Sequence, residues 1–288
     1  MYAFIDSNRG RWPVDKMARA MKISLRSYYD YKAGIPSRRE QKREELERRI
    51  QVVYAAAKGR YGAPRIAAEI KADGYPVSGN TVSKYMKRMG LRSKLCCKYK
   101  GSHSYKPHSL RICPNHLDRQ FTADTPGKVW VSDITYIHTK QGFIYLTSVI
   151  DLYDRKVVGW SLSDNLTAKD TAVRAYQMAV RNRKVAEGMI FHSDRGVQYA
   201  SEEFRTEIKG KVVQSMSRKG NCWDNAVAES FFRNLKCEMI YGNKEMSAEQ
   251  MEMEIFEYIE IWYNKTRRHS TLQNMTIDEF WSINKKSA

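Results

Sequence analysis

Apolar side chains follow two different periods along this chain. In the first third they recur at spacings of three and four residues, as in Leu46, Ile50, Val53 and Ala57, which marks one face of a long helix. After Lys128 the pattern changes to short apolar runs of strand length. The chain is therefore predicted to contain a helical N-terminal part and a later part that mixes strands with helices.

Several helices are expected in the N-terminal part. Two short helices fill residues 13–33, with Ser24 capping the second, and a long helix runs over about 38–58. A helix over 65–73 follows, and after a glycine-rich turn Asn80 caps one more. The region is predicted to be all-helical.

The last two of these helices form a helix–turn–helix pattern with basic side chains. Lys84, Lys87 and Arg88 stand between the apolar positions of the second helix, and Arg65 belongs to the first. Such a pattern is typical of a protein that reads the DNA major groove. An ordinary helical hairpin with solvated basic side chains is the alternative. We predict DNA contact through these four residues.

The formal net charge of +18 is concentrated in the first part of the chain. Residues 1–120 hold 27 Lys and Arg against 10 Asp and Glu, whereas residues 121–288 hold 23 against 22. A polycation favours nucleic acid as its partner, because binding releases counterions from the phosphate backbone. Double-stranded DNA is the expected partner, and a basic surface without a specific partner is the alternative.

Cysteine usage and hydropathy indicate the inside of the cell. Five cysteines, an odd number without a secretory framework, favour a reducing compartment. The N-terminus has no apolar stretch of the kind found in a signal peptide, and no run approaches the roughly 20 apolar residues that span a bilayer. We expect a soluble, cytoplasmic protein without a membrane partner.

The second part alternates between strand and helix signals. Apolar runs predict strands at 129–137, 143–152, 157–162, 189–192 and 212–216. Helices are expected from Thr167 or Asp170, from Ser201, around Glu229, and from Ser247 to about Tyr263. Three consecutive strands followed by alternating helices and strands describe an α/β fold with a mixed five-stranded sheet flanked by helices.

These patterns divide the chain into five segments. The expected boundaries are a small helical unit at 1–36, a helix–turn–helix region at 37–95, a linker at 96–125, a catalytic core at 126–240, and a C-terminal helical extension at 241–288.

Three carboxylates stand where rigid elements could aim them at one place. Asp133 lies inside a strand, where Asp is otherwise poorly suited, and Asp194 stands just beyond another strand. Glu229 lies on a helix that presents Asn225 and Lys236 on the same side, where both are expected to contact DNA. An edge Asp, a simple turn and an exposed charged helix are the alternatives for the three acids. Catalysis by Asp133, Asp194 and Glu229 beside a phosphate backbone is the hypothesis.

Carboxylate oxygens suit Mg²⁺ or Mn²⁺, and two such ions can support phosphodiester cleavage without a histidine base. We therefore expect His192 to pack near the site, and Asp151 to lie toward the opposite end of the sheet. Trp223, Phe231 and Phe232 are expected to hold the Glu229 helix against the core.

Two further groups of residues carry weaker signals. Arg267 and Arg268 form a basic exit from the last long helix, where they could contact DNA or a second subunit, or simply cap the helix. A loose set of cysteines and histidines suggests zinc, although its spacing matches no usual ligand pattern. That set comprises Cys96, Cys97, His103, His108, Cys113 and His116.

The motifs around the three carboxylates resemble those of the bacterial insertion-sequence-3 family of transposases, in the product of the second reading frame. The resemblance rests on the segments 130–136 (WVSDITY), 192–196 (HSDRG), 219–225 (KGNCWDN) and 229–232 (ESFF). It is extended by Asn264 with 267–270 (RRHS) and by 60–66 (RYGAPRI), so that it covers nearly the whole chain.

The resemblance implies a ribonuclease-H-like catalytic core of the kind shared with retroviral integrases. It implies that Asp133, Asp194 and Glu229 are the acidic triad and that Lys236 is the basic residue after it. It further implies a bacterial, nucleoid-associated enzyme that forms a homo-oligomer on terminal inverted repeats. Mg²⁺-dependent cleavage of element ends, strand transfer to a circular intermediate, and integration into target DNA would follow.

Two features depart from the family's pattern. Thirty-four residues separate Asp194 from Glu229, where the family usually has thirty-five, and the loop at 209–211 could absorb the difference. The family's complete enzyme is commonly a fusion with an upstream helix–turn–helix and leucine-zipper segment, without which this chain begins. An upstream-frame product is therefore an expected partner.

Two other classes of function remain as alternatives. A DNA-binding regulator would use only the basic half, and a ribonuclease H would cut RNA–DNA hybrids with the acidic half alone. Three carboxylates together with a basic helix–turn–helix favour the transposase.

Overall fold

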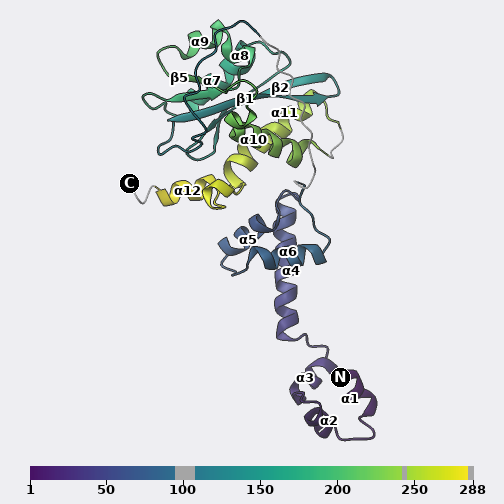
Figure 1. Ribbon diagram of the computed structural model, residues 1–288. Helices are drawn as coiled ribbons and strands as arrows, with labels where there is room; N and C mark the ends of the chain where they lie inside the picture. The colour runs from purple at the N-terminus through teal and green to yellow at the C-terminus, as the bar shows by residue number, and fades with distance from the viewer. Residues whose placement is uncertain (95–107, 242–244, 285–288) are drawn as a thin grey trace. The chain divides into compact units, whose positions relative to one another are not determined.

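The chain forms two compact units, Met1–Ser93 and Lys94–Ala288. The computed structural model describes residues 1–94, 108–241 and 245–284. None of the described helices is long and apolar enough to cross a membrane. The two units are drawn in Figure 1 and are described separately below.

The first unit begins with three short helices around a small core. They are α1 (Tyr2–Asn8), α2 (Val14–Ala20) and α3 (Leu25–Lys32). Ile5, Met17, Ala18 and Tyr28 are buried between them. The sequence periodicity predicts α2 and α3 but not α1, because α1 contributes only Ile5 to this core.

Three longer helices complete the first unit: α4 (Arg38–Ala56), α5 (Ala63–Ala72) and α6 (Gly79–Arg88). Ser37 and Glu40 form a capping box at the start of α4, which satisfies two backbone N–H groups. Ser78, and not Asn80, caps α6, since its hydroxyl accepts the Thr81 N–H. The expected helix–turn–helix pattern is present as α5, a turn and α6.

The second unit is built on a mixed five-stranded sheet in the order β3-β2-β1-β4-β5. The strands are β1 (Val129–Thr139), β2 (Gly142–Asp151), β3 (Val157–Ser163), β4 (Ile190–Ser193) and β5 (Val213–Met216). The first three pair antiparallel, and β4 and β5 add parallel strands beside β1. All five predicted strands are confirmed, and the α/β ribonuclease-H-like fold class with them.

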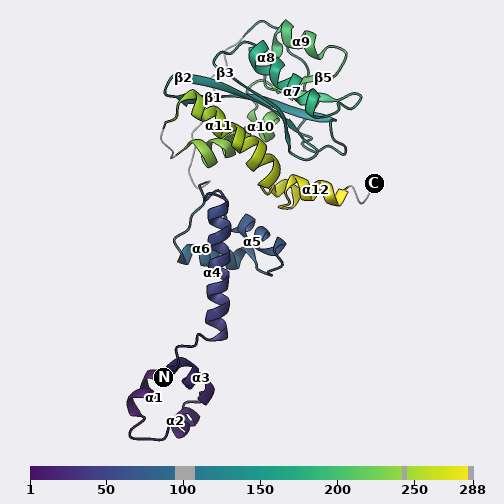
Figure 2. The ribbon, with the colours of Figure 1, turned by 180° about the vertical axis from the view of Figure 1, so that it is seen from behind.

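Helices cover both faces of the sheet, as Figures 1 and 2 show. On one face lie a π-helical turn (Lys169–Val173), α7 (Arg174–Asn182), α8 (Val197–Ala200) and α9 (Glu202–Ile208). The main core fills this layer around Trp130, Tyr176, Phe191 and Phe204. On the other face lie α10 (Ala226–Leu235), its π-helical continuation (Lys236–Ile240) and α11 (Ala248–Phe256).

The C-terminal segment belongs to this unit. After α11 the chain continues as a π-helical segment (Glu257–Thr266) and ends the described part with α12 (Ile277–Asn284), which the sequence patterns do not predict. The Asn264 side chain pairs with both backbone groups of Val157 in β3. The expected C-terminal extension therefore packs directly on the catalytic core.

The expected linker is also packed on the core from residue 108 onward. His108 Nε2 lies 2.7 Å from the backbone oxygen of Arg195, and the His116 N–H donates to Ser215 Oγ at 2.8 Å. Arg155 donates to the backbone oxygen of Phe121 at 2.6 Å. Breaker residues predicted an irregular path here correctly, but irregular backbone does not imply a free linker. The earlier part of that linker lies outside the described residues.

Candidate active site

Asp133 within β1 and Asp194 just after β4 occupy neighbouring positions on adjacent strands. In the parallel ladder Val131 of β1 pairs with His192 of β4, and two residues further along the same register leads to Asp133 and Asp194. Adjacent strands lie about 4.8 Å apart, so the two backbones bring their carboxylates to one edge. This edge follows the carboxyl end of β4, where open sheets commonly bind ligands.

Glu229 lies on α10, near enough for its charge to act on Asp133. The Asn225 side-chain N–H donates to the backbone oxygen of Ser132 at 3.0 Å, which fixes the start of α10 beside Asp133. Phe231 and Phe232 are buried and hold the helix against the sheet, as the sequence predicts. The expectation for Trp223 is wrong, because 69% of its surface is exposed.

The electrostatics of Asp133 show that the three acids share one environment. Burial raises the pKa of its carboxyl well above the ordinary value, and the negative charges of Asp194 and Glu229 raise it further. The Ile134 N–H and the Lys236 ammonium act in the opposite direction. Burial also raises the pKa of Asp194. Lys236 therefore lies within the field of the carboxylates.

One carboxylate oxygen of each aspartate accepts a hydrogen bond from the backbone N–H of a residue that follows it in the chain. The Ile134 N–H donates to Asp133 Oδ1 and the Gly196 N–H donates to Asp194 Oδ1, each at 2.9 Å. A Cβ on Gly196 would lie 3.0 Å from Asp194 Oδ1, so glycine permits this close turn. The other oxygen of each carboxylate, Oδ2, takes no part in these two bonds.

The arrangement is not yet a closed metal cage. Within residues 1–94, 108–241 and 245–284, no three His, Cys, Asp or Glu side chains lie close enough together to hold a metal ion. The donor chemistry nevertheless fits a hard divalent cation, because every candidate ligand is a carboxylate oxygen. A cation would also relieve the repulsion that raises the pKa of Asp133.

Buried polar side chains support the β4–β5 edge of the site. His192 is fully buried between Ser215 and Ser217, at 2.8 and 3.2 Å, and burial lowers its pKa to about 4. It is therefore neutral at physiological pH and packs near the site, as the sequence predicts.

Asp151 is also fully buried at the other end of β1, bonded to Trp130 and Arg183.

Asp224 is the centre of a network of hydrogen bonds that the sequence reasoning missed. Its buried carboxylate accepts hydrogen bonds from Arg218, Arg119 and Asn115, and the bonds from Arg218 and Arg119 hold its pKa far below the ordinary value. They fix the loop between β5 and α10, and so the approach to Glu229. Arg119 gives no local signal, since it lies 105 residues from Asp224.

Three of the residues expected to contact DNA are buried instead. Asn225 is 3% exposed and is committed to Ser132. Arg267 forms a buried ion pair with Glu238 at 2.7 Å, and Arg268 pairs with Glu279 at 2.7 Å. DNA contact requires an accessible donor, so the structure assigns these three side chains to the fold.

The basic candidates of the first unit lie at its surface to differing degrees. Lys84 and Lys87 are exposed on α6. Arg88 is exposed too, but it pairs with Glu47 of α4 and lies 4.5 Å from the ring of Tyr85. Arg65 is half-buried beside the Tyr61 ring. Their contact with DNA stays a prediction.

The sequence reasoning also missed a basic groove in this unit. It has a volume of about 560 Å³ and lies between the start of α4 and the start of α6. Arg38, Arg39, Lys42 and Arg43 line one side, and the other side includes Ser78, Thr81 and Tyr85. Acidic Glu40 and Glu44 within the same helical run obscured this one-sided charge in the sequence.

The described members of the loose cysteine and histidine set have separate partners. Cys96, Cys97 and His103 lie outside the described residues. Cys113 donates to Gln214 at 3.2 Å, whereas His108 is bonded at Arg195 and His116 is exposed.

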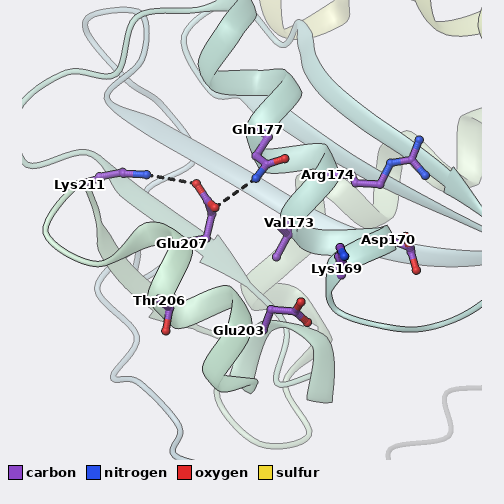
Figure 3. A pocket seen from close by; sticks show the side chains of 9 residues that line it. All are labelled: Lys169, Asp170, Val173, Arg174, Gln177, Glu203, Thr206, Glu207 and Lys211. Carbon is purple, nitrogen blue, oxygen red and sulfur yellow. Dashed lines mark hydrogen bonds and ion pairs between the residues drawn. The ribbon is translucent and has the colours of Figure 1, made fainter.

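Figure 3 shows a separate hollow of about 420 Å³ between α7 and α9. Glu207 is held there by Lys211 and Gln177, each at 3.1 Å. Three acidic and three basic side chains line it, and none of them is a candidate carboxylate of the site above. Because the positive and negative side chains balance, the lining favours neither a cation nor an anion as a ligand, and we assign no site to this hollow.

Family models match both units. The model described as "Integrase core domain" matches residues 123–222, and a second of that description matches 211–276. The model described as "HTH-like domain" matches residues 40–100. The fold and its carboxylate edge thus define a protein of the integrase-core class with a helix–turn–helix region.

Similar proteins come from insertion sequences. "Transposase InsF for insertion sequence IS3A" of Escherichia coli (strain K12) is 38% identical over 98% of this chain and 99% of that protein. "Insertion element IS600 uncharacterized 31 kDa protein" of Shigella sonnei is 34% identical over 90% and 95%. The solved catalytic core domain of BIV integrase is 15% identical over 56% of this chain and 97% of that chain, with a TM-score of 0.40. The chain belongs to the family of insertion-sequence IS3 transposases.

Proposed function

We propose that this transposase cleaves and rejoins DNA strands at Asp133, Asp194 and Glu229. The register of β1 against β4 carries the proposal, because it brings the two aspartates to neighbouring positions on adjacent strands. Glu229 is included as the third acid because its charge raises the pKa of Asp133. The substrates are the terminal inverted repeats of an element and its target DNA, on which several copies of the chain assemble.

The three carboxylates would hold two Mg²⁺ or Mn²⁺ ions. Such ions supply an activated attacking oxygen and stabilise the charge on the leaving 3′ oxygen. Asp133 and Asp194 would each offer the oxygen that lies beyond its backbone bond. Burial of these carboxylates strengthens their attraction for a cation, because the surroundings screen charge less than water does.

Each reaction replaces one oxygen substituent on a DNA phosphorus by another. In cleavage, a water oxygen bonds to phosphorus and the bond to the 3′ oxygen breaks, leaving a 3′ hydroxyl and a 5′ phosphate. In strand transfer, that 3′ hydroxyl attacks a target phosphorus and releases a new 3′ hydroxyl. Each transfer forms one ester bond as it breaks one, so no external energy source is required.

Cationic side chains would position the DNA. Lys236 acts on Asp133 electrostatically, which supports a role in which its ammonium would face a phosphate next to the reacting one. In the first unit, Lys84 and Lys87 of α6 and the basic groove of α4 would contact the repeat DNA. Phosphate contacts would supply affinity and base contacts would supply sequence preference.

The test separates cleavage from binding in the full chain. Asp133→Asn, Asp194→Asn and Glu229→Gln should each lower cleavage of a terminal-repeat duplex in Mg²⁺ by more than roughly 100-fold. Affinity for the same duplex should stay within a few-fold of wild type. Glu187→Gln, which removes an exposed acid before β4, is the matched control. Cleavage by any of the three variants at the control's rate would refute the assignment, as would cutting restricted to RNA–DNA hybrids.

A further inference from the structure

The first three helices of the chain have the internal geometry of a second helix–turn–helix. The turn between α2 and α3 contains four residues, Met21, Lys22, Ile23 and Ser24. DNA-binding helix–turn–helix units use a turn of about this length. The HTH-like family match begins at residue 40 and so does not include this unit.

The turn is closed by a specific set of backbone bonds. The Ile23 N–H donates to Ala18 O and the Lys22 N–H donates to Arg19 O, both within 3.1 Å. Lys22 adopts a left-handed backbone with φ of 55°, which completes a Schellman ending of α2. The chain therefore reverses sharply and sends α3 out at a fixed angle.

The buried positions are those that such a unit requires. Met17 and Ala18 of α2 and Tyr28 of α3 form the core together with Ile5 of α1. Ala18 is small, so α3 can pack closely over α2. Tyr28 donates to Asp6 of α1 at 3.1 Å, and this bond fixes the rotation of α3 about its axis.

That rotation exposes one face of α3. At ~100° per residue, Arg26 and Asp30 point away from Tyr28, whereas Tyr29 lies to one side with its ring centroid 5.3 Å from that of Tyr28. Arg26 has 90% of its side chain exposed, and 55% of Tyr29 is exposed. Asp30 lies 3.9 Å from Arg26 across one turn, a weak surface pair that leaves both groups accessible.

The same construction occurs in the helix–turn–helix that the family model does match. There the Tyr75 N–H donates to Ile70 O and the Gly74 N–H donates to Lys71 O, again with a left-handed residue in the turn. A serine precedes the second helix in both units, Ser24 before α3 and Ser78 before α6. The first helix of each pair thus ends in the same way, before a turn over 21–24 in one unit and over 73–78 in the other.

We propose that α2 and α3 form a second DNA-binding unit, with α3 in the major groove of a duplex. Residues 1–34 hold seven Lys and Arg against three Asp, a net +4, which matches a polyanion. Arg26 is suited to a guanine edge, Asp30 to a cytosine amino group, and Tyr29 to a base or sugar face. The inference is independent of the carboxylate site, because it concerns binding alone.

The experiment compares full-length variants by equilibrium binding and footprinting. It uses a terminal-repeat duplex and a scrambled duplex of equal length. The double variant Arg26→Ala with Tyr29→Ala changes only exposed side chains, and circular dichroism checks that it folds. Arg11→Ala, in the exposed loop between α1 and α2, is the control for loss of charge.

The double variant should bind at least one of the duplexes roughly tenfold more weakly than the control. On the repeat it should also lose protection over one major-groove stretch, while Lys84→Ala with Lys87→Ala loses a different stretch. Weakening on the repeat alone assigns the unit to element ends, and equal weakening on both duplexes assigns it to target DNA. Unchanged affinity for both duplexes, with an unchanged footprint, would overturn the proposal.

Discussion

Asp133 is held in surroundings that oppose its own charge. Burial, Asp194 and Glu229 all raise the pKa of its carboxyl, and Lys236 and one backbone N–H offset them only in part. Groups placed at such a cost are common at functional sites. A divalent cation changes the balance, because carboxylates that repel one another in its absence all attract it.

Trp223 and Phe231 test which aromatic side chains hold the Glu229 helix. Trp223→Ala should change the free energy of unfolding by less than about 0.5 kcal/mol, because the side chain is exposed. Phe231→Ala should cost about 3–5 kcal/mol, because it empties a buried position. Urea unfolding of both variants gives the comparison. Equal losses would contradict the orientation of this loop.

Gly159 controls how closely α7 approaches β3. A Cβ at this position would lie 2.2 Å from the Ala175 carbonyl oxygen and 2.6 Å from the Ala179 backbone nitrogen. Gly159→Ala should therefore lower the stability of the second unit by about 1–3 kcal/mol or more. Gly10→Ala, whose Cβ would meet no atom within 4 Å, should be nearly neutral. Thermal unfolding measures both, and a neutral Gly159→Ala would refute the close packing.

The pair of Glu238 and Arg267 joins the two helical segments of the second face. Burial alone would raise the pKa of Glu238, but Arg267, Trp262 and Tyr258 outweigh burial and lower it. Its contribution to stability is therefore present above the ordinary carboxyl pKa, near 4.5, and is lost as the pH falls through the lowered value.

Breaking this pair should have a pH-dependent cost. Arg267→Met should lose about 3–5 kcal/mol at pH 7, because it leaves a buried carboxylate without its cation. The difference from wild type should shrink as the pH falls through the range in which Glu238 becomes protonated, which in the wild type lies below the ordinary carboxyl value. Urea unfolding at pH 7 and within that range is the measurement. A loss of equal size at both would show that the ion pair is not its source.

Local pattern was sufficient for the sheet and for the three candidate carboxylates. Runs of apolar residues fix where each strand lies, and Asp133 and Asp194 are placed by strands. It was not sufficient for Arg267, which reads as an exposed basic residue until Glu238, 29 residues earlier, is brought against it. Trp223 failed for the converse reason, since aromatic character favours burial without ensuring it.

The net positive charge and the candidate carboxylates lie in different parts of the chain. The first 120 residues carry nearly all of the net positive charge, and the carboxylate edge lies in the nearly balanced remainder. The shorter spacing between Asp194 and Glu229 leaves the β4–β5 ladder in regular register, with the turn after α9 at Lys209 and Gly210. That the loop at 209–211 absorbs the shorter spacing stays a prediction.

Binding of Mn²⁺ to the chain on terminal-repeat DNA tests the central claim most directly. Electron paramagnetic resonance counts bound ions without requiring turnover. Wild type should bind two ions per active site, whereas Asp133→Asn, Asp194→Asn and Glu229→Gln should each lose at least one, with DNA binding retained. Glu187→Gln should match wild type. Bound Mn²⁺ at wild-type level in all three variants would contradict a metal site formed by these carboxylates.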